Sequence, residues 1–460
     1  MQTISNEQLE KTQASLSKLS EIHSSEIVDG ESHFRSAKRM LKGLTAVEIA
    51  RLIEASPPKS RRFIWQILDQ EFIADILQEL PEEVAGQFAT AMDTQRLADL
   101  TEELDVDDVA DILQQLPDQV VQEVLASMSV QNRQRVETVL SYEKDTAGGL
   151  MDTDVITVRP RFTLDVVLRY LRRHEEIPSS TDQLVIVNAD NVFLGTLSIS
   201  KLLTSDPTIT VREVMKTDND PIPVDMSDSE VAKLFEQNNW ISAPVVNEQR
   251  EVVGRITIDD VVDVIIEDAN HSLMSFAGLD EEEETFAPLL KTVPRRAIWL
   301  GINLITAVIA SAVINLFQDT IEKVVALAIL MPIVASMGGI AGSQTLTVVI
   351  RGIALGQIGA SNSKWLLNRE ILSSLLNGML WSTALALLTA WWFDDIKIAV
   401  IIAVATIINL LASALGGTLI PLLLKRMSID PALAGGVVLT TITDVVGFVA
   451  FLGLATLFYV

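Results

Sequence analysis

The segment Pro431–Val460 reads PALAGGVVLTTITDVVGFVAFLGLATLFYV, and Asp444 is its only charged residue. This run exceeds the roughly 20 apolar residues that an α-helix needs to cross a bilayer. A carboxylate near the bilayer centre costs about 2.5–3.5 kcal/mol even on lenient insertion scales, so chains keep one mainly where it meets water or an ion. We therefore predict that Asp444 lines a cation path. The alternative is a protonated carboxyl or a helix cap within a bundle.

The residues before Asp444 add oxygen atoms and space. Thr440, Thr441 and Thr443 carry hydroxyls, and the pair Gly435-Gly436 precedes them. Oxygen ligands suit a hard cation such as Mg²⁺, and paired small residues allow close helix approach. The pattern indicates a hard-cation pathway.

Four other stretches contain no Asp, Glu, Lys or Arg: Ala297–Gln318, Val324–Ile350, Ile371–Phe393 and Ile398–Leu424. Together with the last segment they predict five transmembrane helices. Lys and Arg concentrate before the first span and in alternate loops. By the positive-inside rule, the long N-terminal part is expected in the cytosol and Val460 outside.

Charge is unevenly distributed along the chain. From Ala297 onward seven acids balance seven bases, so the whole formal charge of −26 belongs to residues 1–296. Such a surface repels nucleic acid and anionic headgroups and concentrates cations, although acids can also serve solubility alone. There are no cysteines, which excludes disulfides and thiolate metal sites. Since no paired acid–base set, P-loop or nucleophile–His arrangement is found, we do not expect an enzyme.

Residues 36–140 are predicted to be helical and repetitive. Ala74–Pro81 (ADILQELP) recurs as Ala110–Pro117 (ADILQQLP), a shift of 36. Short amphipathic helices stopped by Pro at this period indicate stacked helical hairpins in a small superhelix. The polar, Ser-rich residues 1–35 are predicted to be a disordered tail.

The sequence pattern of residues 151–268 indicates two similar α/β halves. Leu184–Val187 and Ala243–Val246 read as buried strands, and second strands follow at Gly195 and Gly254. The two glycines are 59 residues apart, which indicates a tandem repeat. The fold class is therefore a mainly α polytopic membrane protein that carries a helical domain and a tandem α/β domain.

Three motifs in this order resemble the bacterial MgtE magnesium transporters. They are Ser141–Met151 (SYEKDTAGGLM), Met331–Val334 leading to Gly338-Gly339, and Asp430–Ala432 with Thr440-Thr441 and Asp444. The resemblance implies a domain order, whose boundaries we predict as follows: tail 1–35, N domain 36–140, CBS domains 141–205 and 206–268, connecting helix 259–290, and pore domain 291–460.

The resemblance also implies a function. Such proteins are homodimers in the bacterial inner membrane, with a pore on the two-fold axis lined by the residue that matches Asp444. They take up Mg²⁺ and are gated by cytosolic Mg²⁺ that bridges acidic residues. The candidate sensing positions in this sequence are Asp107, Asp111, Asp259, Asp260, Asp263, Glu267 and Asp268. Asp260, Asp263 and Glu267 also share one stripe of a helix, which by itself could be a solvated acidic face.

Nucleotide binding is left open by the sequence. Many CBS domains hold adenosine ligands with a Gly-x-x-Thr-x-x-Asp run, which Gly254, Thr257 and Asp260 match. The equivalent position of the first half is Lys201, where the ribose-binding carboxylate is missing. One competent half-site leaves ATP as an alternative regulatory ligand beside Mg²⁺.

Two departures from the family pattern bear on selectivity and gating. Ile340 stands where the family usually has Asn, which favours a changed preference among Mg²⁺, Co²⁺ and Mn²⁺. His271 and Ser272 stand where acids are usual in the connecting helix, so His271 either makes gating sensitive to pH or is an exposed polar residue. Two other functions fit the fold: a divalent cation exchanger coupled to Na⁺ or H⁺, and an adenylate sensor anchored by its spans.

Overall fold

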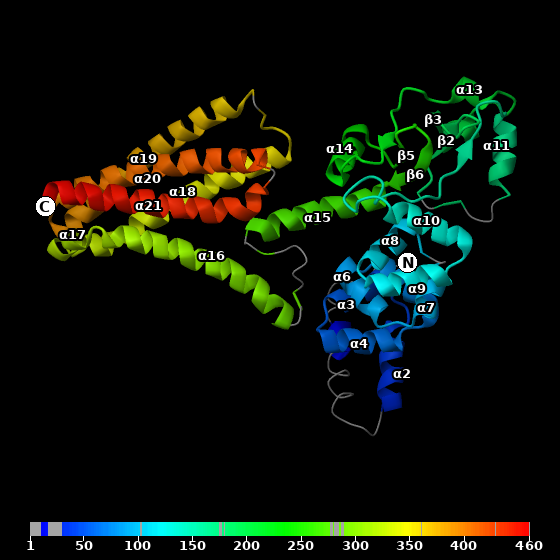
Figure 1. The fold of residues 1–460 in the computed structure, drawn as a ribbon, viewed down its shortest axis with the longest axis horizontal. Helices are drawn as coiled ribbons and strands as arrows, with labels where there is room; N and C mark the ends of the chain where they lie inside the picture. Colours follow the sequence, from blue (N-terminus) through cyan, green and yellow to red (C-terminus); the bar gives the residue numbers. More distant parts are fainter. Residues whose placement is uncertain are drawn as a thin grey trace. The chain divides into compact units, whose positions relative to one another are not determined.

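A computed structural model describes residues 11–16, 30–101, 104–173, 177–178, 180–276, 279, 285–286, 289–359, 361–427 and 429–459. The chain forms two compact units, Met1–Asp268 and Ala269–Val460, and each is described by itself. Figure 1 shows the order of their elements. The long helix α15 (Ile258–Phe276) begins in the first unit and ends in the second.

The first part of unit 1 is a stack of short helices. They are α2 (Gly30–Leu41), α3 (Ala46–Glu54), α4 (Pro58–Ile67), η1 (Gln70–Phe72), α5 (Ile73–Gln78), α6 (Glu82–Thr90), α7 (Thr94–Leu100), α8 (Val106–Gln114), α9 (Asp118–Ser127) and α10 (Val130–Leu140). The two repeated sequences lie on α5 and α8. Each of these helices ends shortly before a proline, because proline cannot continue a helix. Pro81 and Pro117 are the N-cap residues of the following helices, α6 and α9.

The N-terminal region differs from the predicted tail. Residues 11–16 are helical, and Leu16 is fully buried in the core of the helical stack. Helix α2 begins at Gly30, within the range predicted to be disordered. The other residues of that range, 1–10 and 17–29, lie outside the described part of the chain.

The second part of unit 1 holds two three-stranded sheets. One has the order β1 (Thr157–Val158), β2 (Gln183–Val187), β3 (Phe193–Ser198), and the other β4 (Ile222–Pro223), β5 (Ser242–Val246), β6 (Val252–Thr257). In each sheet the first pair is parallel and the second antiparallel. The short helices around them are α11 (Leu164–Leu171), α12 (Ile199–Thr204), α13 (Val211–Val214) and α14 (Asp228–Asn238). The four longer strands were predicted, whereas β1 and β4 are too short to leave a sequence pattern.

The cores of unit 1 explain which parts are held together. One hydrophobic cluster continues from the helical stack into the second α/β half, through Val109 and Leu113 of α8 and Val261 and Val264 of α15. The first α/β half has a separate cluster around Leu164 and Ile186. Helix α8 and the start of α15 therefore pack in one hydrophobic cluster, which brings their polar residues close together.

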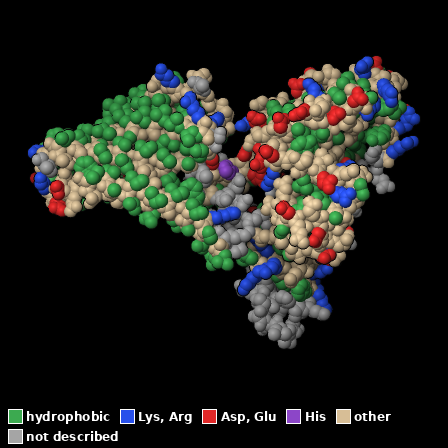
Figure 2. Space-filling model, in the orientation of Figure 1, with side chains coloured by type: hydrophobic (Ala, Val, Ile, Leu, Met, Phe, Trp, Pro, Cys, Tyr) green, Lys and Arg blue, Asp and Glu red, His purple; other side chains and the backbone are tan. Residues whose placement is uncertain are grey.

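Unit 2 is built from long apolar helices, and hydrophobic side chains cover the face of it seen in Figure 2. They are α16 (Leu289–Asn315), α18 (Ala326–Ala354), α19 (Ser363–Phe393), α20 (Ile396–Arg426) and α21 (Pro431–Tyr459), with the short α17 (Gln318–Lys323) after α16. Within the described residues, these five long helices are long and apolar enough to cross a membrane. The first predicted span is too long at its C-terminal end, because α16 stops at Asn315. The third is too short at its N-terminal end, because α19 begins at Ser363.

Helix α20 is the central helix of unit 2, and it packs against α18, α19 and α21. Small residues permit this close packing. A Cβ atom added to Gly417 of α20 would lie 2.9 Å from the backbone oxygen of Gly342 on α18, closer than real contacts allow. Gly435 of α21 likewise lies against Leu346 of α18. Of the glycine pair noted in the sequence, Gly435 is therefore used for helix packing, whereas a Cβ atom on Gly436 would meet nothing within 4 Å.

Candidate functional site

The carboxylate predicted to line a pore is half-buried on α21 of the isolated chain. The three hydroxyls near Asp444 do not all face it. Thr440 and Thr441 lie one helical turn before Asp444 and share its side of the helix, whereas Thr443 is fully buried in the bundle. Each of the three hydroxyls donates a hydrogen bond within α21, to Gly436, Val437 and Thr440 respectively. Their oxygen lone pairs are still available, but the predicted cluster of three around the carboxylate is reduced to two.

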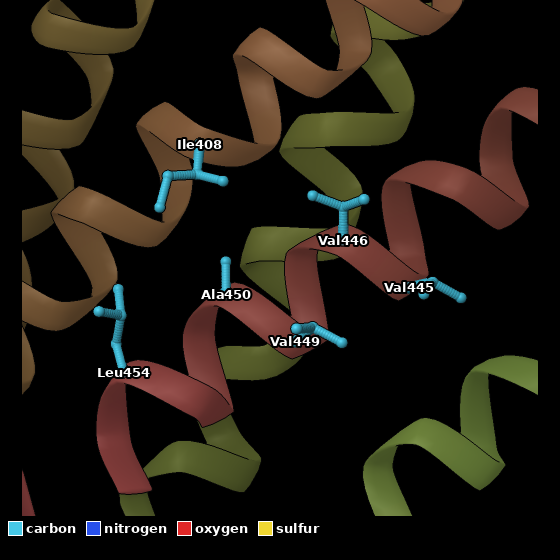
Figure 3. Close-up of a pocket in the computed structure, with 6 residues that line it drawn as sticks. All are labelled: Ile408, Val445, Val446, Val449, Ala450 and Leu454. Carbon is cyan, nitrogen blue, oxygen red and sulfur yellow. The ribbon is translucent and has the colours of Figure 1, made fainter. Parts of the chain in front are cut away.

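An apolar groove of about 540 Å³ lies next to this position. Figure 3 shows that its walls come from Ile408 on α20 and from α21, whose contributions are Val445, Val446, Val449, Ala450 and Leu454. The lining contains no charged side chain, so the groove itself offers nothing to a cation. It is suited to an apolar surface such as another helix or a lipid chain.

A second carboxylate lies within one of the candidate spans, and the sequence analysis missed it. Glu370 is two turns into α19, and its side chain is only 14% exposed. Its two oxygens contact the Thr345 hydroxyl of α18 and the Arg369 guanidinium, both at 3.4 Å. It was overlooked because the third span was defined by its charge-free residues and therefore began at Ile371.

In unit 1, acidic residues from α8 gather against the start of α15. Asp107 is only 8% exposed, and its Oδ1 atom is buried without a hydrogen-bond partner. Burial, and then the neighbouring carboxylates of Asp260, Asp108 and Asp152, hold the pKa of Asp107 well above its usual range. A buried carboxylate with an unused oxygen and acidic neighbours is a position where a cation would relieve both burial and repulsion.

The pKa values of two further carboxylates of this cluster are also raised by burial. Burial raises the pKa of Asp108 to about 7, against a hydrogen bond that Gln78 donates at 2.8 Å. Burial also raises the pKa of Asp260 to about 7, although the backbone N–H and the hydroxyl of Thr257 both donate to its Oδ2 atom. Asp259, which is exposed, raises the pKa of both by charge repulsion.

Basic residues lie at the rim of the cluster, where Arg135 pairs with Asp154. The Arg255 guanidinium lies 3.5 Å from the carboxylate of Asp152, and both side chains are buried. Arg255 lowers the pKa of Asp152 and of Asp105, but burial outweighs it, so both are raised. Within the described residues, no group of three or more His, Cys, Asp or Glu side chains is already arranged to hold a metal ion.

The predicted sensing residues are thus brought together in part. Asp107, Asp259, Asp260 and Asp263 interact electrostatically, and Asp263 is raised in pKa by burial and by Asp259. Asp268 lies apart from them, where it accepts a hydrogen bond from Ser229. Four members were missed by the sequence analysis: Asp105, Asp108, Asp152 and Asp154.

The predicted nucleotide positions have other roles in the fold. A Cβ atom on Gly254 would lie 2.7 Å from the backbone oxygen of Asp152, so packing alone requires glycine there. Thr257 is buried and donates to Asp260, which caps the start of α15. Because Asp260 also belongs to the acidic cluster, its surroundings repel a polyphosphate.

His271, near the end of α15, contacts the membrane part of the chain. Its Nε2 atom lies 3.3 Å from the carboxylate of Asp430, which immediately precedes α21, and 3.5 Å from the hydroxyl of Ser275. The His271 side chain is 45% exposed and at the same time in contact with Asp430. The side chain of Ser272 lies outside the described residues.

The fold and these two sites define a class: a multi-pass membrane protein with a carboxylate within an apolar helix and an acid-rich N-terminal unit. Sequence profiles of known families narrow this class. The profile described as "Divalent cation transporter" matches residues 331–454, that of the MgtE intracellular N domain matches 44–145, and that of the CBS domain matches 147–206 and 211–267. The chain belongs to the MgtE family of divalent cation transporters, and is thus a transporter rather than an enzyme.

This chain is also similar to individual magnesium transporters and to one solved cytosolic domain. Magnesium transporter MgtE of Bacillus subtilis is 27% identical over 93% of this chain and 95% of its own length. Magnesium transporter MgtE of Thermus thermophilus is 29% identical over 71% of this chain and 73% of its own length. The crystal structure of the cytosolic domain of the Mg²⁺ channel MgtE in complex with ATP is 28% identical, with a TM-score of 0.48, and covers 55% of this chain and 99% of that one.

Proposed function

We propose that this protein carries Mg²⁺ into the bacterial cell through a pore lined by Asp444 on the axis of a homodimer. The observation that carries the proposal is a lone carboxylate half-exposed in the middle of an apolar helix, with two hydroxyls on its side of the helix. The names of the relatives support Mg²⁺ as the ion. A divalent ion gains about 4.6 kcal/mol per 100 mV on entering a negative cell, so uptake needs no coupled ion.

The second part of the proposal is regulation by internal Mg²⁺. The carboxylates of Asp107, which is buried, and of Asp108 and Asp260, which are half-buried, lie close enough to repel one another. A hard cation with oxygen ligands would neutralise them and hold α8 against the start of α15. Because the ion binds one arrangement better, rising internal Mg²⁺ shifts the population toward that arrangement, which we assign to the closed pore.

Glu370 favours one alternative, an exchanger driven by Na⁺ or H⁺. Coupled transport normally needs a second ionisable group in the spans, and Glu370 provides one. Its contacts with Thr345 and Arg369 give it a structural role as well, which makes uniport the better-supported mechanism.

Flux into proteoliposomes separates the two mechanisms. An imposed inside-negative potential, with equal pH and Na⁺ on both sides, should drive Mg²⁺ entry in wild type and in Glu370→Gln alike. A flux that requires a pH or Na⁺ gradient, and that Glu370→Gln abolishes, would establish exchange instead.

The proposal also includes ATP as a regulatory ligand. It is supported by the relative whose cytosolic domain was crystallised with ATP, and by the match of Gly254, Thr257 and Asp260. Calorimetric titration of the full-length protein with ATP, with Thr257→Ala as the comparison, tests it. Equal binding by both proteins would place any nucleotide elsewhere.

A further inference from the structure

Asn409 lies in the middle of α20 and is 0% exposed. Its Nδ2 atom donates to the backbone oxygen of Val334 on α18 at 2.9 Å, and one turn later the Ser413 hydroxyl donates to the backbone oxygen of Gly338 at 2.7 Å. These are hydrogen bonds between different helices of the membrane unit. Asn409 is also the only amide side chain in the charge-free run of α20.

Two glycines on different helices make room for this amide. A Cβ atom added to Gly338 of α18 would lie 2.1 Å from Asn409 Nδ2, and one added to Gly447 of α21 would lie 2.7 Å from it. Both distances are too short for any side chain. The amide therefore occupies a slot between two bare backbones and contacts α18 and α21 at once.

This three-helix contact is one turn from the pore carboxylate. Gly447 follows Asp444 by three residues, about 4.5 Å along the helix axis. Thr443, the neighbour of Asp444, is fully buried on the side of α21 that carries Gly447. The depth and rotation of α21 at Asp444 are consequently set by how Asn409 fits.

Packing alone does not explain an asparagine here. Its Oδ1 atom is buried and has no hydrogen-bond partner, so half of the amide is desolvated without compensation. Leucine branches at the same atom and would fill the slot without that cost. The bond from Nδ2 to the backbone of α18 is the interaction that offsets this cost.

We propose that Asn409 is a positioning residue for ion selectivity, which rests on the proposed role of Asp444 in the pore. Mg²⁺ loses its bound water reluctantly, so the carboxylate of Asp444 recognises the hydrated ion by the distance between them. Asn409 fixes that distance by tying α21 to α18. Without the tie, α21 adjusts to ions that change their hydration more readily, such as Mn²⁺ and Co²⁺, and discrimination falls while conduction continues.

The test is the ratio of Mg²⁺ to Mn²⁺ flux through purified full-length protein in proteoliposomes, for wild type and Asn409→Leu. The ratio should fall about 3- to 20-fold, the range expected for loss of one hydrogen bond between membrane helices. Thr406→Val is the matched control. Thr406 is buried on the same helix, but its hydroxyl donates only to Ile402 of α20, so its ratio should not change. An unchanged ratio in Asn409→Leu overturns the proposal.

A second pair of variants covers the case in which Asn409→Leu does not fold. Gly447→Ala should displace the amide and lower the ratio, and Asn409→Ala with Gly447→Ala removes the clash. The double variant should recover thermal stability but keep the low ratio. Recovery of both would mean that Asn409 only packs. Loss of flux in Asp444→Ala tests the pore separately, so failure of one proposal can be told from failure of the other.

Discussion

Replacing Asp108 with Asn should stabilise the protein at pH 8 when no divalent cation is present. The side chain keeps its shape, and its oxygen can still accept the hydrogen bond from Gln78. The folded pKa of about 7 lies above the ordinary value of 3.8, so between these values the folded state binds more protons than the unfolded state. Stability is therefore lost as pH rises from about 4 to 7, and Asn removes this loss.

The size of the effect can be bounded. A shift of about three pKa units corresponds to at most about 4 kcal/mol, because one unit is about 1.36 kcal/mol. Asp108 is partly exposed and shares the repulsion with its neighbours, so we expect about 1–2 kcal/mol. For a folded unit of this size, that raises the melting temperature by roughly 3–6 °C.

Mg²⁺ should reverse the order of stability of wild type and Asp108→Asn. If Mg²⁺ is bound by this cluster with a Kd of about 1 mM, then 10 mM Mg²⁺ stabilises wild type by about 1.4 kcal/mol. Asp108→Asn should gain much less, because one carboxylate is missing. The assay is thermal unfolding of full-length protein in detergent, followed by tryptic cleavage within residues 1–268, at pH 5 and pH 8, with chelator or Mg²⁺.

The control is Asp190→Asn, an exposed acid in the turn between β2 and β3. It should change neither the pH dependence nor the response to Mg²⁺. The reasoning is refuted if Asp108→Asn is no more stable than wild type at pH 8, if its advantage is as large at pH 5, or if Mg²⁺ stabilises both proteins equally.

Three further outcomes are expected. Ile340→Asn should raise Mg²⁺ flux relative to Co²⁺ only if position 340 meets the ion; since Ile340 is exposed on the single chain, an unchanged ratio would mean that it faces lipid or a partner helix. In wild type, Mg²⁺ flux should fall about two- to fivefold between pH 7.5 and pH 6, because protonation of His271 strengthens its pair with Asp430 and ties α15 to α21. His271→Gln should remove this fall. An identical pH profile in His271→Gln and wild type argues against this. Asp107→Asn combined with Asp260→Asn should leave flux that internal Mg²⁺ no longer inhibits, and normal inhibition in the double variant would move the sensor elsewhere.

The sequence predicts the spans well because hydropathy is a local property. The five helices, the four longer strands and the repeat on α5 and α8 all follow from patterns within short segments. The errors at Asn315 and Ser363 arise at the membrane boundary, where polar residues continue a helix or apolar residues leave it.

The acidic cluster could be predicted only in part, because it depends on contacts between distant segments. The resemblance pointed to Asp107 and Asp111 on α8, whereas Asp108, the neighbour of Asp107, also reaches the cluster. Packing of α8 against α15 decides this, and no local pattern encodes it. Asn409 was overlooked for a similar reason, since its importance comes from glycines on two other helices.

The central claim is that Asp444 lines the path of the ion, and Mg²⁺ flux through Asp444→Ala tests it most directly. Purified wild type, Asp444→Ala and Asp319→Ala, an exposed acid on α17, would be compared in proteoliposomes under the same inside-negative potential. Loss of the only charge in α21 should reduce Mg²⁺ entry at least tenfold in Asp444→Ala, with the protein still folded, while Asp319→Ala transports normally. Wild-type flux in Asp444→Ala would contradict the account.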